Sequence, residues 1–430
     1  MRTARCTLGF AVVLAGQTLS PAADQTIARV TEHMLANAAR MPSYTCVETV
    51  ARDYYWPAAS TLPRACPILM ELRRHPTPDM MLRFVMSDRL RLDVTLTRER
   101  EIFSWVGARS FNDTTIDQVV HEGPIGTGAF GGFLSVIFKQ DVHEFHFERN
   151  VVEQGRPLLE YSFAVPQQAS NYKVRVPGSW VSAGYTGSIV VDPVAGEVVR
   201  LTVQTAELPE ATRCCQISLN LNLQGVTIGS SRFLLPARAL QHYVMETGEE
   251  AENTITFDGC REYRGESTVT FAPPDAAAAN SSAKAEEAPL RIFPNQSFTF
   301  ELTTPIAALT AAAGDPIAGK LVTPLLTERR STRARAGSRV EGHLLRVSRH
   351  HLAPVDTIVV IQLESVEIGG VKVPLACVRD WSKVFADRRK RKEILLPLPF
   401  EKNAGVFRFD GDEPVVRNFR SDWRTLPAAP

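Results

Sequence analysis

The stretch SIVVDPVAGEVVRLTVQT, residues 188–205, decides the fold that we expect. Two runs rich in β-branched residues flank the turn from Asp192 to Gly196, which places a glycine where a tight hairpin needs a positive φ. Runs of this kind on both sides of such a turn are typical of paired antiparallel strands. The stretch therefore predicts a β-hairpin.

Similar strand patterns extend along the chain in both directions from this hairpin. They are joined mostly by short polar turns and not by helices, which favours one large antiparallel sheet and a mainly β protein. The predicted strands of this sheet cover residues 44–55, 81–96, 101–105, 144–150, 158–165, 188–192, 198–205, 216–223, 232–235, 239–246, 254–258 and 267–271.

Two segments break the strand pattern and predict helices. Ile27, Val30, Met34 and Leu35 recur at helical spacing before Pro42, which predicts one amphipathic helix. The segment Ile125–Phe138 is apolar on all sides and rich in glycine at its start. A short helix that is apolar all round must be buried, so we expect this segment to pack against the concave face of the sheet.

The composition divides the mature chain into two domains. The segment Pro273–Ala288, within a predicted disordered linker at 272–289, holds Ala, Ser, Pro, Lys and Glu but no large apolar residue. The first domain then covers residues 24–271. The second, residues 290–430, carries strand patterns at 340–347, 357–366 and 371–378, with one or two helical turns at Ile306–Ala313. We expect it to be a small β-barrel or sandwich.

Residues 1–22 are typical of a secretory signal peptide. Arg2 and Arg5 precede the mostly apolar, uncharged stretch Cys6–Leu19, and small residues follow, so cleavage is expected after Ala22 or Ala23. The stretch is shorter than the about 20 residues of a membrane anchor. We therefore expect an exported protein, periplasmic or extracellular.

Export predicts disulfide bonds among the six cysteines that remain after the signal. Cys46 and Cys66 lie at the ends of what look like neighbouring strands, and we expect them to pair. Cys260 is expected to pair with Cys214 or Cys215, because adjacent cysteines cannot both reach one partner. Cys377 is predicted to be a small buried hydrophobe.

The charge pattern argues against nucleic acid as a partner. The formal net charge is +1. From Leu290 onward there are 22 Lys and Arg against 15 Asp and Glu, so the C-terminal part is basic. A solvated surface is the simpler interpretation, and anionic lipid is the alternative. The densest basic segment is Arg388, Arg389, Lys390, Arg391 and Lys392.

The motifs that resemble catalytic or cofactor sites lack their structural context. Gly126-x-Gly128-x-x-Gly131 matches a dinucleotide fingerprint, but no parallel β/α alternation follows it. In a strand, His143 and His146 face opposite sides, so they cannot share a metal ion. Nucleophile elbows and zinc-protease motifs are absent from the sequence. We expect no cofactor and no metal, and we favour a noncatalytic protein.

The N-terminal pattern resembles the lipoprotein-carrier fold of the LolA, LolB and RseB type. The resemblance rests on an amphipathic helix after a signal, on long antiparallel strands, and on the Val191-Asp192-Pro193-x-x-Gly196 hairpin followed by Arg200. That family implies an open antiparallel half-barrel over residues 24–271, with helices lining a hydrophobic cavity for acyl chains. Its helical lid would fall on Ile125–Phe138.

The whole chain also resembles an uncharacterised class of secreted acidobacterial proteins, which implies a compartment but no activity. The second domain resembles β-barrel domains of envelope proteins, at Gly314-Asp315-Pro316-Ile317 and Arg339–Gly342. The phrases that carry the resemblance of the whole chain are Tyr44-Thr-Cys46-Val-Glu48, Phe103-Ser-Trp105, Gly126–Gly131, Cys260–Tyr263 and Glu266-Ser-Thr.

Three functions follow as hypotheses. The first is a noncatalytic envelope protein that binds an apolar ligand, such as a lipid or a lipoprotein acyl chain, in the concave face of its sheet. The second is a structural or interaction module that contacts other envelope proteins, and the third is a secreted hydrolase with an unrecognised site. Under the first hypothesis the cavity would be lined by Trp105, Ile125, Phe130, Phe133, Leu134, Ile137 and Phe138.

Overall fold

The structure is a computed structural model, and it describes residues 21–40, 43–58, 65–75, 81–97, 100–107, 115–139, 144–170, 172–176, 179–205, 208–262, 290–329, 332–382, 395–411, 415 and 417–427. Residues 1–20 of the predicted signal, the predicted linker, the predicted strand at 267–271 and the basic segment Arg388–Lys392 lie outside these ranges. The described chain is mainly β, as the sequence predicts.

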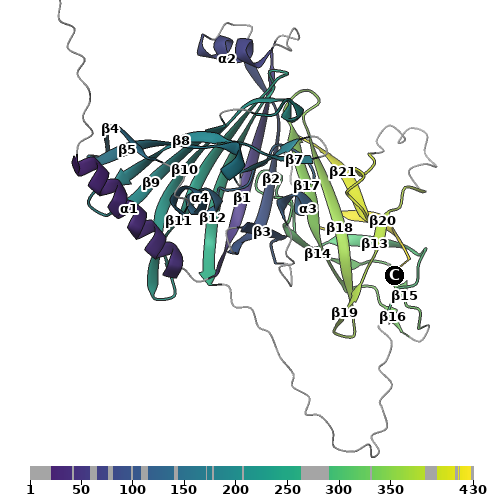
Figure 1. Ribbon diagram of the computed structural model, residues 1–430. Coiled ribbons are helices and arrows are strands. Elements are labelled where there is room, and N and C mark those ends of the chain that lie inside the picture. The colour runs from purple at the N-terminus through teal and green to yellow at the C-terminus, as the bar shows by residue number, and fades with distance from the viewer. Residues whose placement is uncertain are drawn as a thin grey trace, which may run out of the picture.

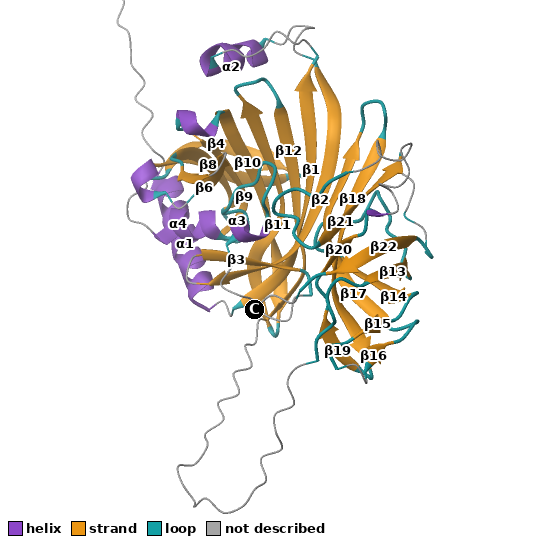
Figure 2. Ribbon diagram, turned by 90° about the vertical axis from the view of Figure 1, so that its right-hand side faces the viewer, coloured by secondary structure: helices purple, strands orange, loops and turns teal. Residues whose placement is uncertain are grey.

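The N-terminal strands form one open sheet in which every described pair is antiparallel (Figures 1 and 2). The order across the sheet is β4 (His146–Glu153), β5 (Arg156–Val165), β8 (Tyr185–Asp192), β9 (Glu197–Thr205), β10 (Cys214–Ile228), β11 (Ser231–Met245), β12 (Glu250–Glu262), β1 (Tyr44–Pro57), β2 (Leu82–Thr97) and β3 (Arg100–Trp105).

The β8–β9 hairpin has the predicted turn. Gly196 has a φ of 69°, and its N–H donates to the Asp192 carbonyl at 2.8 Å. The Asp192 carboxylate accepts the N–H groups of Val194 and Ala195 at 2.8 and 3.0 Å, which closes the turn from the other side. The aspartate and the glycine thus fix this hairpin, because each supplies what the turn backbone lacks.

Strand β11 joins two predicted strands, at 232–235 and 239–246, into one. Pro236 lies between them and pairs with Leu223 of β10, next to a register shift. A proline has no N–H for the sheet ladder, so it is tolerated best beside such an irregularity.

Two helices cover the inner face of this curved sheet (Figures 1 and 2). Helix α1 (Pro21–Arg40) is the predicted amphipathic helix; it buries Val30 and Met34, whereas Leu35 is exposed. The Tyr161 hydroxyl donates to the Ala23 carbonyl at 2.8 Å and holds the start of α1 on β5. Helix α4 (Gly132–Lys139) packs beside α1.

The prediction of one helix over Ile125–Phe138 is wrong for its first half. Only the part from Gly132 onward is helical, and residues 122–131 form an irregular segment that crosses the inner face of the sheet. Glycines explain the difference, because Gly128 has a φ of 99°, which a helix does not allow.

The segment Pro166–Gly187, which the sequence pattern leaves unplaced, contains a small hairpin of its own. Strands β6 (Lys173–Val176) and β7 (Ser179–Ser182) pair with each other, preceded by a 3-10 turn at Gln167–Ala169. The Arg175 guanidinium donates to the carbonyls of Val120, at 2.7 Å, and His121. The hairpin therefore fixes the backbone of residues 120–121, which follow α3 (Ile116–Val119).

The C-terminal strands build a second, smaller group, which has its own core around Phe300, Val359 and Trp423. A short pair, β15 (Leu325–Leu326) and β16 (Arg333–Ala334), forms a separate two-stranded sheet beside the larger strands. The order of the larger strands is β20 (Cys377–Arg379), β22 (Arg420–Thr425), β13 (Ser297–Leu302), β14 (Pro316–Leu321), β17 (Arg339–His350), β18 (Asp356–Ile368) and β21 (Ala404–Asp410), with β19 (Val371–Pro374) also on β18.

Strand β2 connects the two groups of strands. Its residues 86–88 pair with 348–350 of β17, and Ala313 forms backbone hydrogen bonds with Arg89 and Arg91 at 2.8 Å. The predicted helical stretch Ile306–Ala313 is only a single turn at Ala307–Ala311, because Ile306 bridges to Val415 at one end and Ala313 bridges to Leu90 of β2 at the other. The second group thus continues the sheet of the first.

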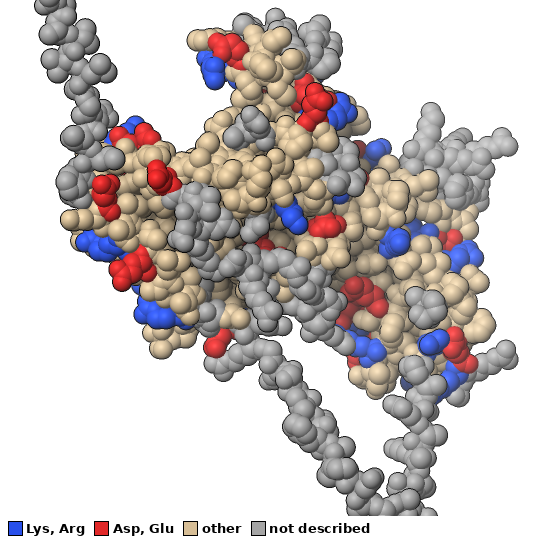
Figure 3. All heavy atoms as spheres, in the orientation of Figure 1, with Lys and Arg blue, Asp and Glu red and all other residues tan. Residues whose placement is uncertain are grey.

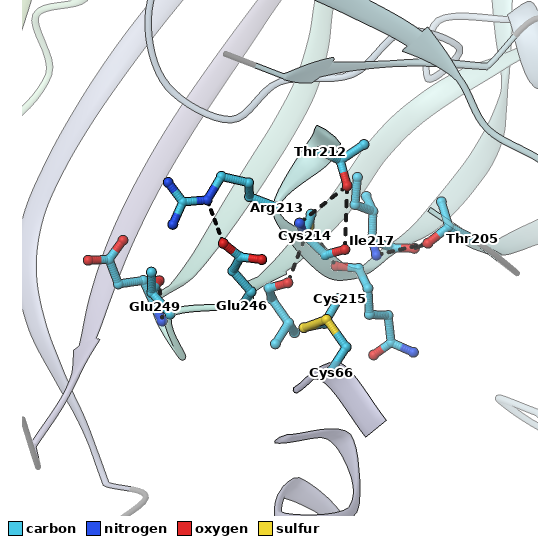
Figure 4. The surroundings of a disulfide bond; sticks show 12 residues. Cys66, Thr205, Thr212, Arg213, Cys214, Cys215, Ile217, Glu246 and Glu249 are labelled. Atoms are coloured by element: carbon cyan, nitrogen blue, oxygen red, sulfur yellow. Dashed lines mark hydrogen bonds and ion pairs between the residues drawn. A yellow bond between two sulfur atoms is a disulfide. The ribbon is translucent and has the colours of Figure 1, made fainter. Parts of the chain in front are cut away.

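Two disulfides are present, but the predicted pairing is wrong. Cys46 pairs with Cys260, and Cys66 pairs with Cys215 (Figure 4). Cys46 and Cys260 lie on β1 and β12, which are neighbours in the sheet although 214 residues separate them. Cys66 opens a helix, α2 (Cys66–Arg74), and not a strand. Cys377 is unpaired and buried, as predicted.

Candidate ligand pocket

The irregular segment 122–131 is held on the inner face of the sheet by buried polar side chains. Arg52 of β1 donates to the Glu122 carbonyl at 2.6 Å and forms a bidentate ion pair with Asp88 of β2, at 2.6 and 2.7 Å. Asn253 of β12 donates to the Pro124 carbonyl at 3.0 Å. These contacts satisfy carbonyls that the sheet would otherwise bury without partners.

Glu101 of β3 anchors the second half of the same segment. Its carboxylate accepts the N–H groups of Gly128, Phe130 and Gly132 at 2.8, 3.0 and 3.3 Å. Backbone N–H groups that converge at a helix start make an anion site. Here the site is filled by the protein's own carboxylate, so the glycine pattern at residues 126–131 is no dinucleotide fingerprint.

A cavity of about 460 Å³ lies between α4, β3, α3 and the β6–β7 hairpin; we call it the α4 pocket. The ring of Phe133 lies 4.9 Å from that of Tyr172 and 5.3 Å from that of Tyr185, measured between centroids. Five of its fourteen lining residues are aromatic, and three of these rings pack against one another. The lining residues are Glu101, Phe103, Thr115, Ile116, Asp117, Thr127, Gly128, Gly132, Phe133, Val136, Tyr172, Lys173, Trp180 and Tyr185.

Of the residues predicted to line a cavity, Phe133 lines the α4 pocket. Leu134 is half-buried and packs against the main core. Trp105 lies elsewhere, at the junction of the two groups of strands, where its ring faces His343 at a centroid distance of 5.9 Å. The other four are buried in the core and fill the concave face: Ile125, Phe130, Ile137 and Phe138.

The buried carboxylate of Glu101, in the pocket lining, interacts with a second buried carboxylate, Glu48 of β1. Burial, and secondarily the charge of Glu101, raises the pKa of Glu48 to about 8. Burial also raises the pKa of Glu101, but the backbone N–H groups of Gly128, Gly132, Phe130 and Gly131 oppose that rise. These donors favour the charged form of Glu101, so at neutral pH we place the proton of the pair on Glu48.

Sequence reasoning missed Glu101, Glu48 and the aromatic residues of the β6–β7 region. A signal for the glutamates exists, because Glu101 alternates with Phe103, and Glu48 lies between Cys46 and Val50 on the same face of its strand. A charged residue at such a position indicates a buried partner. Tyr172, Trp180 and Tyr185 lie in the segment that the strand pattern left unplaced.

The described surface has other hollows besides the α4 pocket. A more open trough of about 840 Å³ lies on the outer face of β5, β8 and β9, lined mainly by small polar residues such as Ser188 and Thr202.

Acidic and basic residues are interspersed over the face shown in Figure 3. In the described part of the chain, no three His, Cys, Asp or Glu residues are placed to hold a metal ion.

The predicted strand at 144–150 keeps its two faces. Phe145 and Phe147 are half-buried against the core, whereas Glu144, His146 and Glu148 are exposed. His143 lies outside the described residues. None of the helices that the structure describes is both long enough and apolar enough to cross a membrane.

Compared with known proteins, the chain matches no family model, and no curated protein sequence is similar to it. The resemblance to lipoprotein carriers therefore stays a prediction. The function has to be argued from the pocket itself.

Proposed function

We propose that this chain is a noncatalytic envelope protein that binds an apolar or acyl-bearing ligand in the α4 pocket. The observation that carries the proposal is a cavity of about 460 Å³ whose lining includes five aromatic side chains. Pockets for small apolar ligands measure about 300–1,000 Å³ and combine apolar walls with a few polar groups. The α4 pocket meets both conditions, with Thr115, Asp117, Thr127 and Lys173 as its polar residues besides Glu101.

The polar groups of the pocket support binding more than catalysis. The oxygens of Glu101 are engaged by backbone N–H groups, which favour its anionic form and occupy the lone pairs that a general base would use. The described lining residues include no histidine, serine or cysteine, so a hydroxyl or thiol activated by a neighbouring imidazole has no counterpart among them.

Export to the periplasm or the cell exterior is part of the proposal. It is supported by the two disulfides, because such bonds persist mainly in oxidising compartments. The predicted signal peptide also supports export. A ligand with an apolar body, such as a lipid or the acyl chain of a lipoprotein, is available in both compartments.

One observation favours the alternative, a structural or interaction module of the envelope. Much of the concave face that a lipoprotein carrier would leave open is filled by Ile125, Phe130 and Ile137, each about 1% exposed. Under this alternative the α4 pocket is a packing defect that binds nothing.

A fluorescent apolar probe separates the two functions. N-phenyl-1-naphthylamine brightens in apolar surroundings, and Trp180 in the pocket wall can transfer energy to it. Gly132 lines the pocket, and a Cβ added there would lie 3.4 Å from Glu101 Oε1, an ordinary contact. Gly132→Phe is designed to fill the pocket with its ring, and Gly132→Ala, which adds only the Cβ, is the matched control.

We expect saturable probe binding by the wild type and by Gly132→Ala, with an affinity at least about tenfold lower for Gly132→Phe, or roughly 1.4 kcal/mol. Circular dichroism should show that all three fold alike. No saturable binding by the wild type, or equal binding by all three proteins, would remove the ligand-binding proposal and leave the interaction module.

A further inference from the structure

The charges of the α4 pocket are unevenly distributed between its inner wall and its rim. Glu101 lies in the inner wall and is 8% exposed. Asp117 of α3 and Lys173 of β6 also line the pocket, and both are exposed. The one buried charge that the described lining contains is thus negative, and the lysine lies where water screens it.

The carboxylate of Glu101 cannot turn away from a ligand. Three backbone N–H groups from Gly128 to Gly132 hold its two oxygens, and these groups belong to the segment that Arg52 and Asn253 pin to the sheet. A fixed anion in a poorly solvated wall repels a second anion more strongly than a solvated one would. It also accepts hydrogen bonds, and charge-assisted bonds are the stronger kind.

Lys173 offers only weak compensation for an anionic ligand. Its backbone is fixed, because its N–H and carbonyl form hydrogen bonds with Thr127 Oγ1 and the Thr127 N–H at 3.3 and 3.4 Å. Its ammonium is on an exposed side chain. Ion pairs between exposed groups contribute little, because water screens them, so Lys173 does not offset repulsion by Glu101.

We infer that the α4 pocket selects amphiphiles whose polar end donates hydrogen bonds and bears no negative charge, such as an alcohol, an amide or an ammonium. The apolar chain packs between Phe133, Trp180 and Tyr185, and the donor faces the wall that contains Glu101. This specificity rests on the proposed function. A free carboxylate on the same chain is disfavoured, because burying it beside Glu101 leaves two like charges in one wall.

The test is displacement of N-phenyl-1-naphthylamine by three ligands of equal chain length, below their micellar concentrations and at neutral pH. These are dodecan-1-ol, dodecylammonium and dodecanoate. We expect dodecanoate to bind at least about tenfold more weakly than the other two. The Gly132→Phe protein serves as a blank that reveals binding outside the pocket.

Two variants assign the preference to the inner wall. Glu101→Gln should abolish the discrimination against dodecanoate, and if that protein does not fold, Asp117→Asn tests the same electrostatics at an exposed position. Asp117→Asn should reduce the discrimination by about two- to threefold, because an exposed charge is partly screened. Lys173→Ala should not reduce it.

The outcomes distinguish failure of the inferred selectivity from failure of the proposed ligand-binding function. Discrimination against dodecanoate that weakens in Glu101→Gln or Asp117→Asn supports the inference. Dodecanoate binding as tightly as the alcohol, or a preference for dodecanoate that disappears in Lys173→Ala, overturns the inference and leaves the ligand-binding function standing. Displacement by none of the three ligands, with no probe binding either, overturns both.

Discussion

At the scale of single residues, the inner face of the sheet is unusual for the polar side chains it buries. Glu48, Arg52 and Glu101 are 4–8% exposed, and all belong to strands whose neighbouring positions on that face are apolar. An ion pair compensates for the burial of the Arg52 charge, and backbone hydrogen bonds compensate for the burial of the Glu101 charge. Glu48 instead stays neutral, because burial and the charge of Glu101 raise its pKa to about 8.

Glu48 should therefore make the protein less stable as the pH rises. Its pKa is higher in the folded state than the about 4.3 of an unfolded glutamate, so the folded state binds the proton more tightly. The stability that this proton contributes is fully present below pH 4.3 and is lost as the pH rises toward 8 and beyond. The loss should exceed what exposed carboxylates cause.

Glu48→Gln should remove that pH dependence, since an amide does not titrate. We would measure the free energy of unfolding in urea at pH 5, 7 and 9. The value for the variant minus that for the wild type should increase with pH, by on the order of 3 kcal/mol at pH 9. Glu71→Gln, on a side chain of α2 that is 59% exposed, is the control and should leave the wild-type profile unchanged. A constant difference between Glu48→Gln and wild type at all three pH values would contradict the assigned protonation.

At the scale of elements, α2 is attached to the sheet by very few contacts. Leu69 is the buried residue of this helix, which stands at the rim of the sheet in Figure 1. Its other links are the disulfide from Cys66 to Cys215 and an ion pair between Arg73 and Glu250. A helix of nine residues is too short to be stable alone in water, so the disulfide has to hold it.

Loss of this disulfide should release α2 and leave the sheet intact. In the Cys66→Ser/Cys215→Ser double variant, amide hydrogen exchange at residues 66–74 should become at least about tenfold faster, while β10 and β11 stay protected. Cys214→Ser is the matched control. Burial raises the pKa of the Cys214 thiol to about 11, so this thiol is neutral and does not substitute for Cys215. Unchanged exchange in α2 would show that Leu69 and Arg73 suffice.

The strands could be predicted from the sequence, whereas the partners of the cysteines and the walls of the pocket could not. Alternation along β2, β5 or β9 is a local pattern, and it is visible in any short window. The pairing of Cys46 with Cys260 depends on β1 lying next to β12, which only the register of distant strands decides. The pocket joins Glu101, Phe133 and Trp180 from three separate elements, and its glycine-rich segment looked helical because its residues are apolar.

At the scale of the whole molecule, the two groups of strands are joined more firmly than a linker alone would join them. Strand β2 pairs with β17, and Arg91 forms an ion pair with Asp315 across the junction. Phe84 of β2 stacks on His351 with 4.0 Å between ring centroids. Each group keeps its own core, so the junction resembles an interface between two folded units.

Cutting the predicted linker should therefore not separate the two parts. Limited proteolysis is expected to cut first within residues 273–288 and to leave two stable fragments. These fragments should elute together in gel filtration under native conditions, because the β2–β17 pairing persists. Asp315→Arg should weaken this association by opposing Arg91 with a like charge. Separate elution of the wild-type fragments would mean that the junction is too weak to hold them.

Binding of an apolar ligand in the α4 pocket is tested most directly by native mass spectrometry of the mature protein, purified without detergent from its own envelope, with lipid extraction alongside. We predict a reproducible bound mass that is retained in Gly132→Ala, is lost in Gly132→Phe, and extracts as a molecule with an apolar chain. A clean unliganded mass for the wild type, unchanged after incubation with envelope lipids, would contradict the account.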